Sequence, residues 1–214
     1  MCLHSIQCLG NGRILVAISA AGTFRSTDNG ATWEPFNQGV RADFMPDKFP
    51  EVGQCVHKLL AHPRNPEAIY QQNHCGIYRL DRPATRWVRV GENMPKSVGD
   101  IGLPMVTHPY DAESAWVFPM DGTDVWPRTS PGGKPAAYRT RDGGKTWKRQ
   151  ADGMPTSQAW FTVKRQAMSV DRFTIAGVYF GTTSGEVWGS RDEGRNWRLL
   201  AAHLPEIYAI EAGS

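Results

Sequence analysis

Short runs rich in β-branched and aromatic residues recur along the whole chain, and glycine, proline, asparagine or aspartate separates each run from the next. Helical periodicity is scarce, so the pattern predicts an all-β protein. The runs fall into four groups of four: 2–9, 13–19, 22–27 and 31–36; 55–62, 68–74, 76–80 and 86–91; 103–109, 115–120, 136–140 and 145–150; 162–170, 176–182, 185–190 and 195–200.

A repeated octet lies between the third and fourth runs of each group. It reads STDNGATW at 26–33, TRDGGKTW at 140–147 and SRDEGRNW at 190–197, and a decayed copy, LDRPATRW, stands at 80–87. The closing tryptophans are 54, 60 and 50 residues apart. Four antiparallel strands per period of about fifty residues are typical of a β-propeller blade.

The octet is interpreted as a hairpin turn with a structural role. Its glycine supplies a positive φ, its aspartate and hydroxyl residue accept turn amides, and its tryptophan packs between blades. The carboxylates stand one per blade on the outer rim, so they cannot converge on one substrate as acid–base catalysis requires. The structural octet residues are Ser26, Asp28, Gly30, Trp33, Thr140, Asp142, Gly144, Trp147, Ser190, Asp192, Gly194 and Trp197.

The expected organisation is a single propeller domain over residues 1–214. The blades cover about 1–38, 54–91, 102–150 and 161–201, and an extra C-terminal strand is expected at 205–211. Segment 121–134 is an insertion between the second and third strands of the third blade. Three arrangements stay open: an arc of a larger ring, which we favour, closure by self-association through the open edges, or a compact small ring.

The octet resembles the Asp-box, or BNR repeat, of sialidases, sortilin, xyloglucanase-type glycoside hydrolases and propeller-type photosystem assembly factors. The segments HKLLAHPRNPEAIYQQNHCGIYR and GVYFGTTSGEVWGSRDEG are also similar to bacterial BNR-repeat proteins described as sialidase-like or glycosyl-hydrolase-like, over their C-terminal portion. The resemblance implies the propeller fold, and it carries no particular activity with it.

The composition of the chain argues against some classes of binding partner. The chain is 40% hydrophobic, which suffices for a packed core, and its formal charge of +3 is too small to favour nucleic acid. No run approaches the length of a membrane helix. The first residues lack the pattern of a signal peptide, so a cytoplasmic location is expected. The four cysteines are expected to be free, buried thiols.

Loops at one face of a propeller, together with the inner strands, form its usual ligand site. We expect the ligand-binding residues there, because acids, bases and indole faces in one concave region suit a sugar or another polar ligand. The candidates are Arg41, His57, His74, Trp126, Trp160, Lys164 and Arg165.

Cysteine and histidine alternate twice, as CLH at 2–4 and CVH at 55–57, and NHC follows at 73–75. Metal binding at His4, His57 and His74 stays open, but single Cys-x-His pairs lack a zinc signature, so neither a metal nor a cofactor is predicted.

Catalysis is the less favoured alternative. Asp47, Glu51 and Asp100 are weak candidates for the two carboxylates of a glycoside hydrolase. The resemblance to sialidases would imply an Arg-Ile-Pro motif and an arginine trio, but the motif is missing, and Arg25 and its counterparts in the other blades repeat on the rim as salt-bridge partners. No nucleophile elbow, P-loop or HExxH motif occurs.

The sequence therefore favours a BNR-repeat propeller acting as a binding or scaffold module for a carbohydrate or a protein partner. The alternative is an exo-sialidase-like glycoside hydrolase that uses carboxylates of the top-face loops. An assembly factor is a third possibility, which the weak charge does not favour. Neither nucleic acid nor a membrane is expected as a partner.

Overall fold

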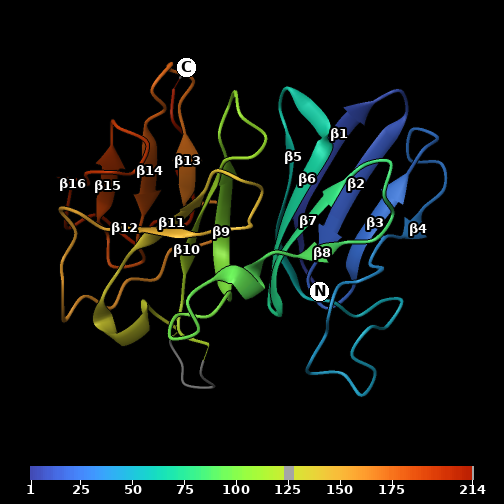
Figure 1. Cartoon of the computed structure of the whole chain (residues 1–214), viewed down its shortest axis with the longest axis horizontal. Helices are drawn as coiled ribbons and strands as arrows, with labels where there is room; N and C mark the ends of the chain where they lie inside the picture. Colours follow the sequence, from blue (N-terminus) through green and yellow to red (C-terminus); the bar gives the residue numbers. More distant parts are fainter. Residues whose placement is uncertain (123–127, 214) are drawn as a thin grey trace.

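The computed structural model of the protein describes residues 1–122 and 128–213. This part of the chain folds into four antiparallel four-stranded sheets with strands in sequence order (Figure 1), so the predicted all-β blade architecture is confirmed. The sheets, called blades 1 to 4, consist of β1 (Leu3–Gly10), β2 (Arg13–Ile18), β3 (Gly22–Ser26) and β4 (Glu34–Pro35); β5 (Val56–His62), β6 (Asn65–Asn73), β7 (Gly76–Asp81) and β8 (Val88–Arg89); β9 (Gly102–Thr107), β10 (Ala115–Pro119), β11 (Ala137–Thr140) and β12 (Lys148–Gln150); β13 (Met168–Val170), β14 (Val178–Gly181), β15 (Val187–Ser190) and β16 (Arg198–Ala201).

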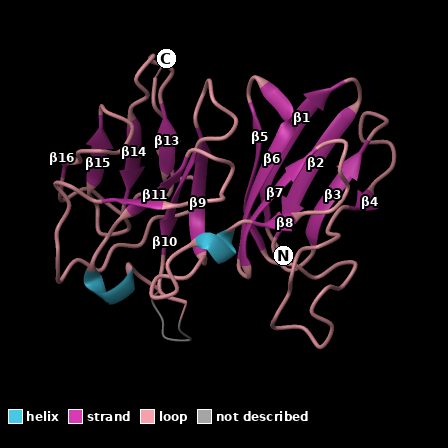
Figure 2. Cartoon of the chain, in the orientation of Figure 1, coloured by secondary structure: helices cyan, strands magenta, loops and turns pink. Residues whose placement is uncertain are grey.

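Helical structure is confined to two short 3-10 turns, η1 (Gly91–Asn93) and η2 (Pro131–Gly133), within the described residues (Figure 2). None of the helices in this part of the chain is long and apolar enough to cross a membrane.

The blades are arranged side by side through their first strands. β1 contacts β5, β5 contacts β9, and β9 contacts β13, so these four inner strands follow one another around a common axis. The outer strands β4 and β16 lie at opposite ends of the molecule (Figure 1). The arrangement is that of an incomplete propeller.

The hydrophobic core lies between neighbouring blades. One cluster joins blade 1 to blade 2, with Phe36 and Leu59 among its members. A larger cluster joins blades 2, 3 and 4, and its aromatic centre includes Trp116, Phe180 and Trp188. Since each cluster draws on more than one sheet, a blade depends on its neighbour for the burial of its apolar face.

Two of the three buried octet tryptophans, Trp87 and Trp147, bond to the preceding blade through the indole N–H. Trp87 is 2% exposed, and its indole N–H donates to the carbonyl of Phe36 in blade 1 at 2.8 Å. Trp147 donates in the same way to the carbonyl of Val90 at 3.1 Å. Trp33 in blade 1 is instead 43% exposed and bonds only the carbonyl of Gly30 in its own turn. The face of blade 1 that carries Trp33 is therefore built like a blade interface, but it is open.

Two segments near the axis are less regular than the sequence pattern predicts. The inner strand of blade 4 begins only at Met168, because residues 164–167 form a turn in which Ala167 N–H donates to Lys164. Segment 205–211, expected as a strand, makes a single parallel bridge between Ala209 and Gln166. Gln166 also donates to the carbonyl of His4 at 2.9 Å, so blades 1 and 4 meet at this point.

All four cysteines are free thiols. Cys75 is buried and Cys55 is half-buried, but Cys2 and Cys8 are exposed, so the expectation of buried thiols is wrong for these two. The reason is their position: both flank or belong to β1, on the open side of blade 1.

Candidate functional site

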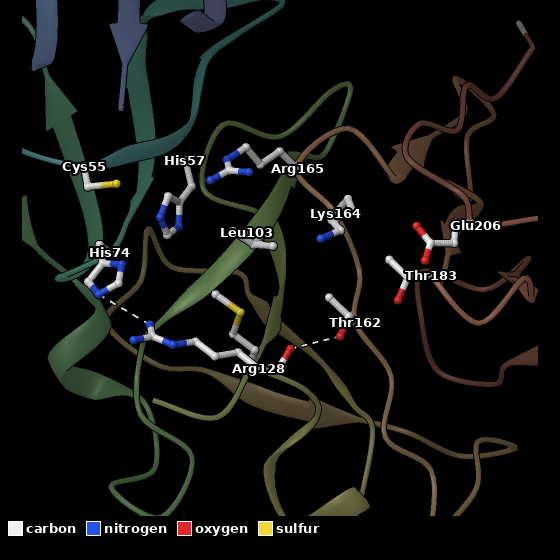
Figure 3. A pocket seen from close by; sticks show the side chains of 11 residues that line it. Cys55, His57, His74, Leu103, Arg128, Thr162, Lys164, Arg165, Thr183 and Glu206 are labelled. Carbon is white, nitrogen blue, oxygen red and sulfur yellow. Dashed lines mark hydrogen bonds between the residues drawn. The ribbon is translucent and has the colours of Figure 1, made fainter. Parts of the chain in front are cut away.

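A cavity of about 450 Å³ lies where the inner strands of blades 2, 3 and 4 approach one another (Figure 3). Its walls combine the start of blade 2, the end of β6, the segment that precedes β13, the loop after β14 and the C-terminal segment. The lining residues are Cys55, His57, His74, Leu103, Met120, Arg128, Thr162, Lys164, Arg165, Thr183 and Glu206.

The lining is predominantly cationic. Lys164 and Arg165 enter the cavity from the turn before β13, and Arg128 approaches along the wall near His74 (Figure 3). Burial lowers the pKa of Arg165, and its Nε is buried without a hydrogen-bond partner among the described residues. Glu206 is the one carboxylate among the described lining residues, so three cations face one anion.

His57 is held as a neutral ring. Its Nδ1 lies 2.7 Å from the carbonyl oxygen of Gly102, which can only accept, so Nδ1 carries the proton and Nε2 keeps a lone pair. Burial, and to a lesser extent the positive charge of Arg165, lower the pKa of His57 to about 3. The ring is therefore uncharged throughout the physiological range.

His74 lies beside His57, with ring centroids 5.6 Å apart in an edge-on arrangement. Arg128 Nη1 is 3.4 Å from His74 Nε2, and an arginine can only donate, so this nitrogen of His74 accepts. Phe44, from the long loop after blade 1, covers His74 with an edge-on contact at 5.7 Å. The loop between blades 1 and 2 thus contacts one of the lining residues, although Phe44 itself does not line the cavity.

Four of the seven predicted ligand-binding residues line this cavity: His57, His74, Lys164 and Arg165. Arg41 does not line it, and its side chain is bound to Asp43 at 2.7 Å. Trp160 is 55% exposed and likewise lies outside the lining. Trp126 falls outside the described residues.

The three weak catalytic candidates are not brought together in the cavity. Asp47 and Glu51 are exposed on the loop between blades 1 and 2, where Asp47 accepts the backbone N–H of Phe49 at 2.9 Å. Asp100 is bound by Arg89 through two hydrogen bonds of 2.9 Å. The carboxylates of Asp47 and Asp100 therefore have local structural roles.

The octets form the same hydrogen-bond network three times. In the first, Ser26 Oγ donates to Asp28 and accepts Gly30 N–H, each at 2.8 Å, while Thr32 binds both oxygens of Asp28, through N–H at 2.9 Å and through its hydroxyl at 2.6 Å. The other two copies repeat these bonds around Asp142 and Asp192. The octets therefore have the geometry of the hydrogen-bonded turns that the sequence predicts.

The carboxylates of the octets are strongly held in their ionised form. The Thr32 hydroxyl, with the Thr32 amide and Ser26, lowers the pKa of Asp28 to about 2. Burial opposes ionisation of Asp142, but bonds from Thr146 and Thr140 outweigh it and lower the pKa of this carboxyl as well.

The rim arginines pair with carboxylates, as expected from their repetition with the blades. Arg25 binds Glu34 at 2.5 Å, and Arg79 binds Asp81 at 2.8 Å. Arg139 binds Glu193 in the octet of blade 4 at 2.8 Å and lies over the ring of Trp116. Arg139 thus joins blade 3 to blade 4, whereas the pairs of Arg25 and Arg79 named here lie within one blade, and none of the three arginines lines the cavity.

Seven lining residues were not among the predicted ligand-binding residues: Cys55, Leu103, Met120, Arg128, Thr162, Thr183 and Glu206. Thr162 and Thr183 carry no distinctive pattern, and Thr162 is fixed by donating to the carbonyl of Arg128 at 2.9 Å. Glu206 belongs to the C-terminal segment, whose strand-like pattern gave no indication that it borders the axis. The seventh octet position, Thr32, Thr146 or Asn196, was also missed as a structural residue, although the repetition of Thr or Asn there could have revealed it.

Comparison with known proteins agrees with the fold. The family model for the BNR/Asp-box repeat matches residues 24–35 and 138–149. None of the curated proteins matches the sequence. The chain carries BNR/Asp-box repeats on two of its four blades by this criterion, and the geometry extends the motif to blade 4.

Several solved structures resemble the chain at low identity. An ancestral GH74 enzyme is 18% identical with a TM-score of 0.68 over 94% of this chain and 24% of that one. YCF48 bound to D1 peptide is 15% identical, TM-score 0.55, over 92% and 52% of the two chains. A Trypanosoma rangeli sialidase mutant is 14% identical, TM-score 0.52, over 94% and 38%. The chain thus spans between a quarter and about half of these structures, and the likeness shows the fold alone.

Proposed function

We propose that the chain is a carbohydrate-binding module whose cavity takes a sugar that carries an acidic group. The cationic lining supports this most directly, because Lys164 and Arg165 share the cavity with a single described carboxylate, Glu206, and Arg165 Nε has no hydrogen-bond partner among the described residues. A buried carboxylate or sulfate needs such partners to offset the cost of leaving water.

The size and remaining chemistry of the cavity also favour a small ligand. Its volume of about 450 Å³ falls in the range of small-molecule sites, roughly 300–1,000 Å³. Thr162 and Thr183 offer hydroxyls to the hydroxyls of a sugar, and Leu103 and Met120 offer apolar contact to the carbons of its ring. A protein partner would need a larger and flatter surface.

The test is calorimetric titration of the chain with acidic sugars and with neutral sugars of the same ring. We expect the acidic sugars to bind and Arg165→Gln to weaken them by roughly 10- to 100-fold, since a hydrogen bond to a charged group contributes about 1.5–3 kcal/mol. Arg195→Gln is the matched control, because Arg195 is 65% exposed on a rim turn. Equal affinity for acidic and neutral sugars, or an equal loss in both variants, would refute the proposal.

The alternative function for the same cavity is glycoside hydrolysis. A hydrolase of the two-carboxylate type needs a pair roughly 5–10 Å apart. We expect chromogenic glycosides of the sugars that bind to stay intact in the presence of the chain. Turnover that disappears in Glu206→Gln would favour the hydrolase over the binding module.

A further inference from the structure

We infer that Cys55, His57 and His74 form a binding site for a Zn²⁺ ion in the wall of the cavity. A ligand atom of each residue, the sulfur of Cys55 and one nitrogen of each ring, lies within 4.8 Å of the other two. Two residues come from the start of blade 2 and the third follows β6, so one β-hairpin holds all three. Figure 3 shows the three side chains grouped at one end of the cavity.

Thiolate and imidazole are ligands that zinc prefers, and three protein ligands with one open position are typical of zinc sites that also bind a further molecule. In a tetrahedral site the ligand atoms are about 3.3–3.6 Å apart, given bond lengths of about 2.0–2.3 Å. The present separations need to close by at most about 1.5 Å. Side-chain rotation of Cys55 and His74, which are both only half-buried, can supply this movement. The ion then takes the lone pair of His74 that now accepts from Arg128 Nη1 at 3.4 Å, so this hydrogen bond breaks on binding.

The surroundings of His57 match those of a metal-binding histidine. Its Nδ1–H donates to the carbonyl of Gly102 at 2.7 Å, which fixes the ring and leaves Nε2 with its lone pair. A backbone carbonyl in this position is the usual outer partner of a histidine ligand. This hydrogen bond therefore prepares the ring for a metal without any rearrangement of the strand.

The positive charges of Arg128 and Arg165 repel a cation. Deprotonation of the Cys55 thiol offsets this repulsion. On binding, the thiol releases its proton to solvent and its sulfur bonds the ion as a thiolate, so the site gains a negative charge and no oxidant or reductant is needed. The fourth position of the ion is left for an anionic ligand in the cavity, since Glu206 lies at the opposite side of it (Figure 3). The cationic side chains of the cavity then bind the anionic ligand of the metal ion.

The structure also changes the residue set that the sequence pattern suggested. His4 is not part of the cluster; its ring lies near Arg165, and burial, with the charge of Arg165, lowers its pKa. Cys55 takes its place, because Cys55 and His74 approach each other at the same end of the hairpin, where His74 N–H donates to the carbonyl of Cys55 at 2.9 Å.

The experiment titrates the reduced, chelator-treated chain with Co²⁺ and then with Zn²⁺, with no sugar present. We expect one equivalent of Co²⁺ to give intense visible bands and a near-ultraviolet thiolate-to-cobalt band, and Zn²⁺ to displace it. Cys55→Ser should abolish the thiolate band, and His74→Gln should weaken Zn²⁺ binding at least about tenfold, since loss of an outer partner alone costs about 10- to 100-fold.

Three variants serve as controls. Cys8→Ser removes an exposed thiol outside the cluster, His203→Gln removes an exposed histidine, and His4→Gln tests the set that the sequence suggested. All three should bind both ions as the unmodified chain does, and thermal melts should show that Cys55→Ser and His74→Gln remain folded. A thiolate band that persists in Cys55→Ser, or no thiolate band in the unmodified chain, overturns the inference and leaves the sugar-binding proposal untouched.

Discussion

At the scale of residues, the octet shows how a polar motif can be mistaken for a catalytic one. The carboxylate of each octet is fully engaged by its own turn: Asp142, for example, accepts from Thr140 and twice from Thr146. A carboxylate with its oxygens committed in this way has little capacity left for proton transfer. Its contribution is to fix the hairpin that leads into the last strand of the blade.

Acid should lower the free energy of unfolding, because it protonates the aspartates of these turns. The native pKa of Asp28, about 2, lies below the value of about 3.9 in an unfolded chain, so its contribution to stability is present at neutral pH. That contribution is lost as the pH falls from about 4 to about 2. Urea unfolding measured across this interval should show a steep decline that becomes shallower in Asp28→Asn. An unchanged slope in the variant would contradict the role assigned to this carboxylate.

At the scale of elements, the unit of stability is the interface between two blades. The indole of Trp87 fills the space between blades 1 and 2, packs edge-on against Phe36 at 5.9 Å, and closes the interface with hydrogen bonds from its ring and its amide. The indole of Trp33 occupies the corresponding position on a face that none of the described blades covers, and is 43% exposed. The tryptophan of the motif therefore contributes differently to stability in the two blades.

Substitution of these two tryptophans provides a matched pair. Trp87→Ala should lower the free energy of unfolding by about 3–5 kcal/mol, the usual cost of removing a buried aromatic ring from a core. Trp33→Ala should cost about 1 kcal/mol or less, because its ring is half in solvent and makes no contact with a preceding blade. Chemical denaturation of both variants checks this, and equal losses would show that the open face of blade 1 is in fact covered.

The blades were predictable from sequence because their determinants are local. Each hairpin is specified by a few positions, such as Gly144 with its positive φ, and the alternation of the flanking runs. The cavity was only partly predictable, because it depends on contacts between distant segments. Lys164 and Arg165 were expected on a regular strand, yet they reach the cavity from a turn, and Glu206 arrives from a segment that lacks any motif.

At the scale of the whole molecule, the arc ends in two exposed apolar faces. Leu3 and Ile6 on β1 are 53% and 56% exposed, and Leu200 on β16 is 57% exposed. Apolar faces and strand edges of this kind favour association. Self-association, one of the arrangements that the incomplete blade count left open, therefore stays a prediction, and these faces are the surfaces that it would use.

Sedimentation velocity at increasing concentration tests this prediction. We expect the chain to form dimers, and Leu200→Glu to shift the population towards monomer because it places a charge in the contact. Val88→Glu is a suitable control, since Val88 is 62% exposed on the outer strand of blade 2, away from both end faces. A monomer at every concentration would exclude association through these faces.

The central claim is that the cavity between blades 2, 3 and 4 binds an acidic sugar. A crystal structure of the chain with the tightest-binding acidic sugar tests it most directly. The account predicts that the acidic group lies within hydrogen-bond distance of Arg165, with the ring between Thr162 and Thr183. A sugar bound elsewhere on the blades, or an acidic group turned away from the cations, would contradict the account.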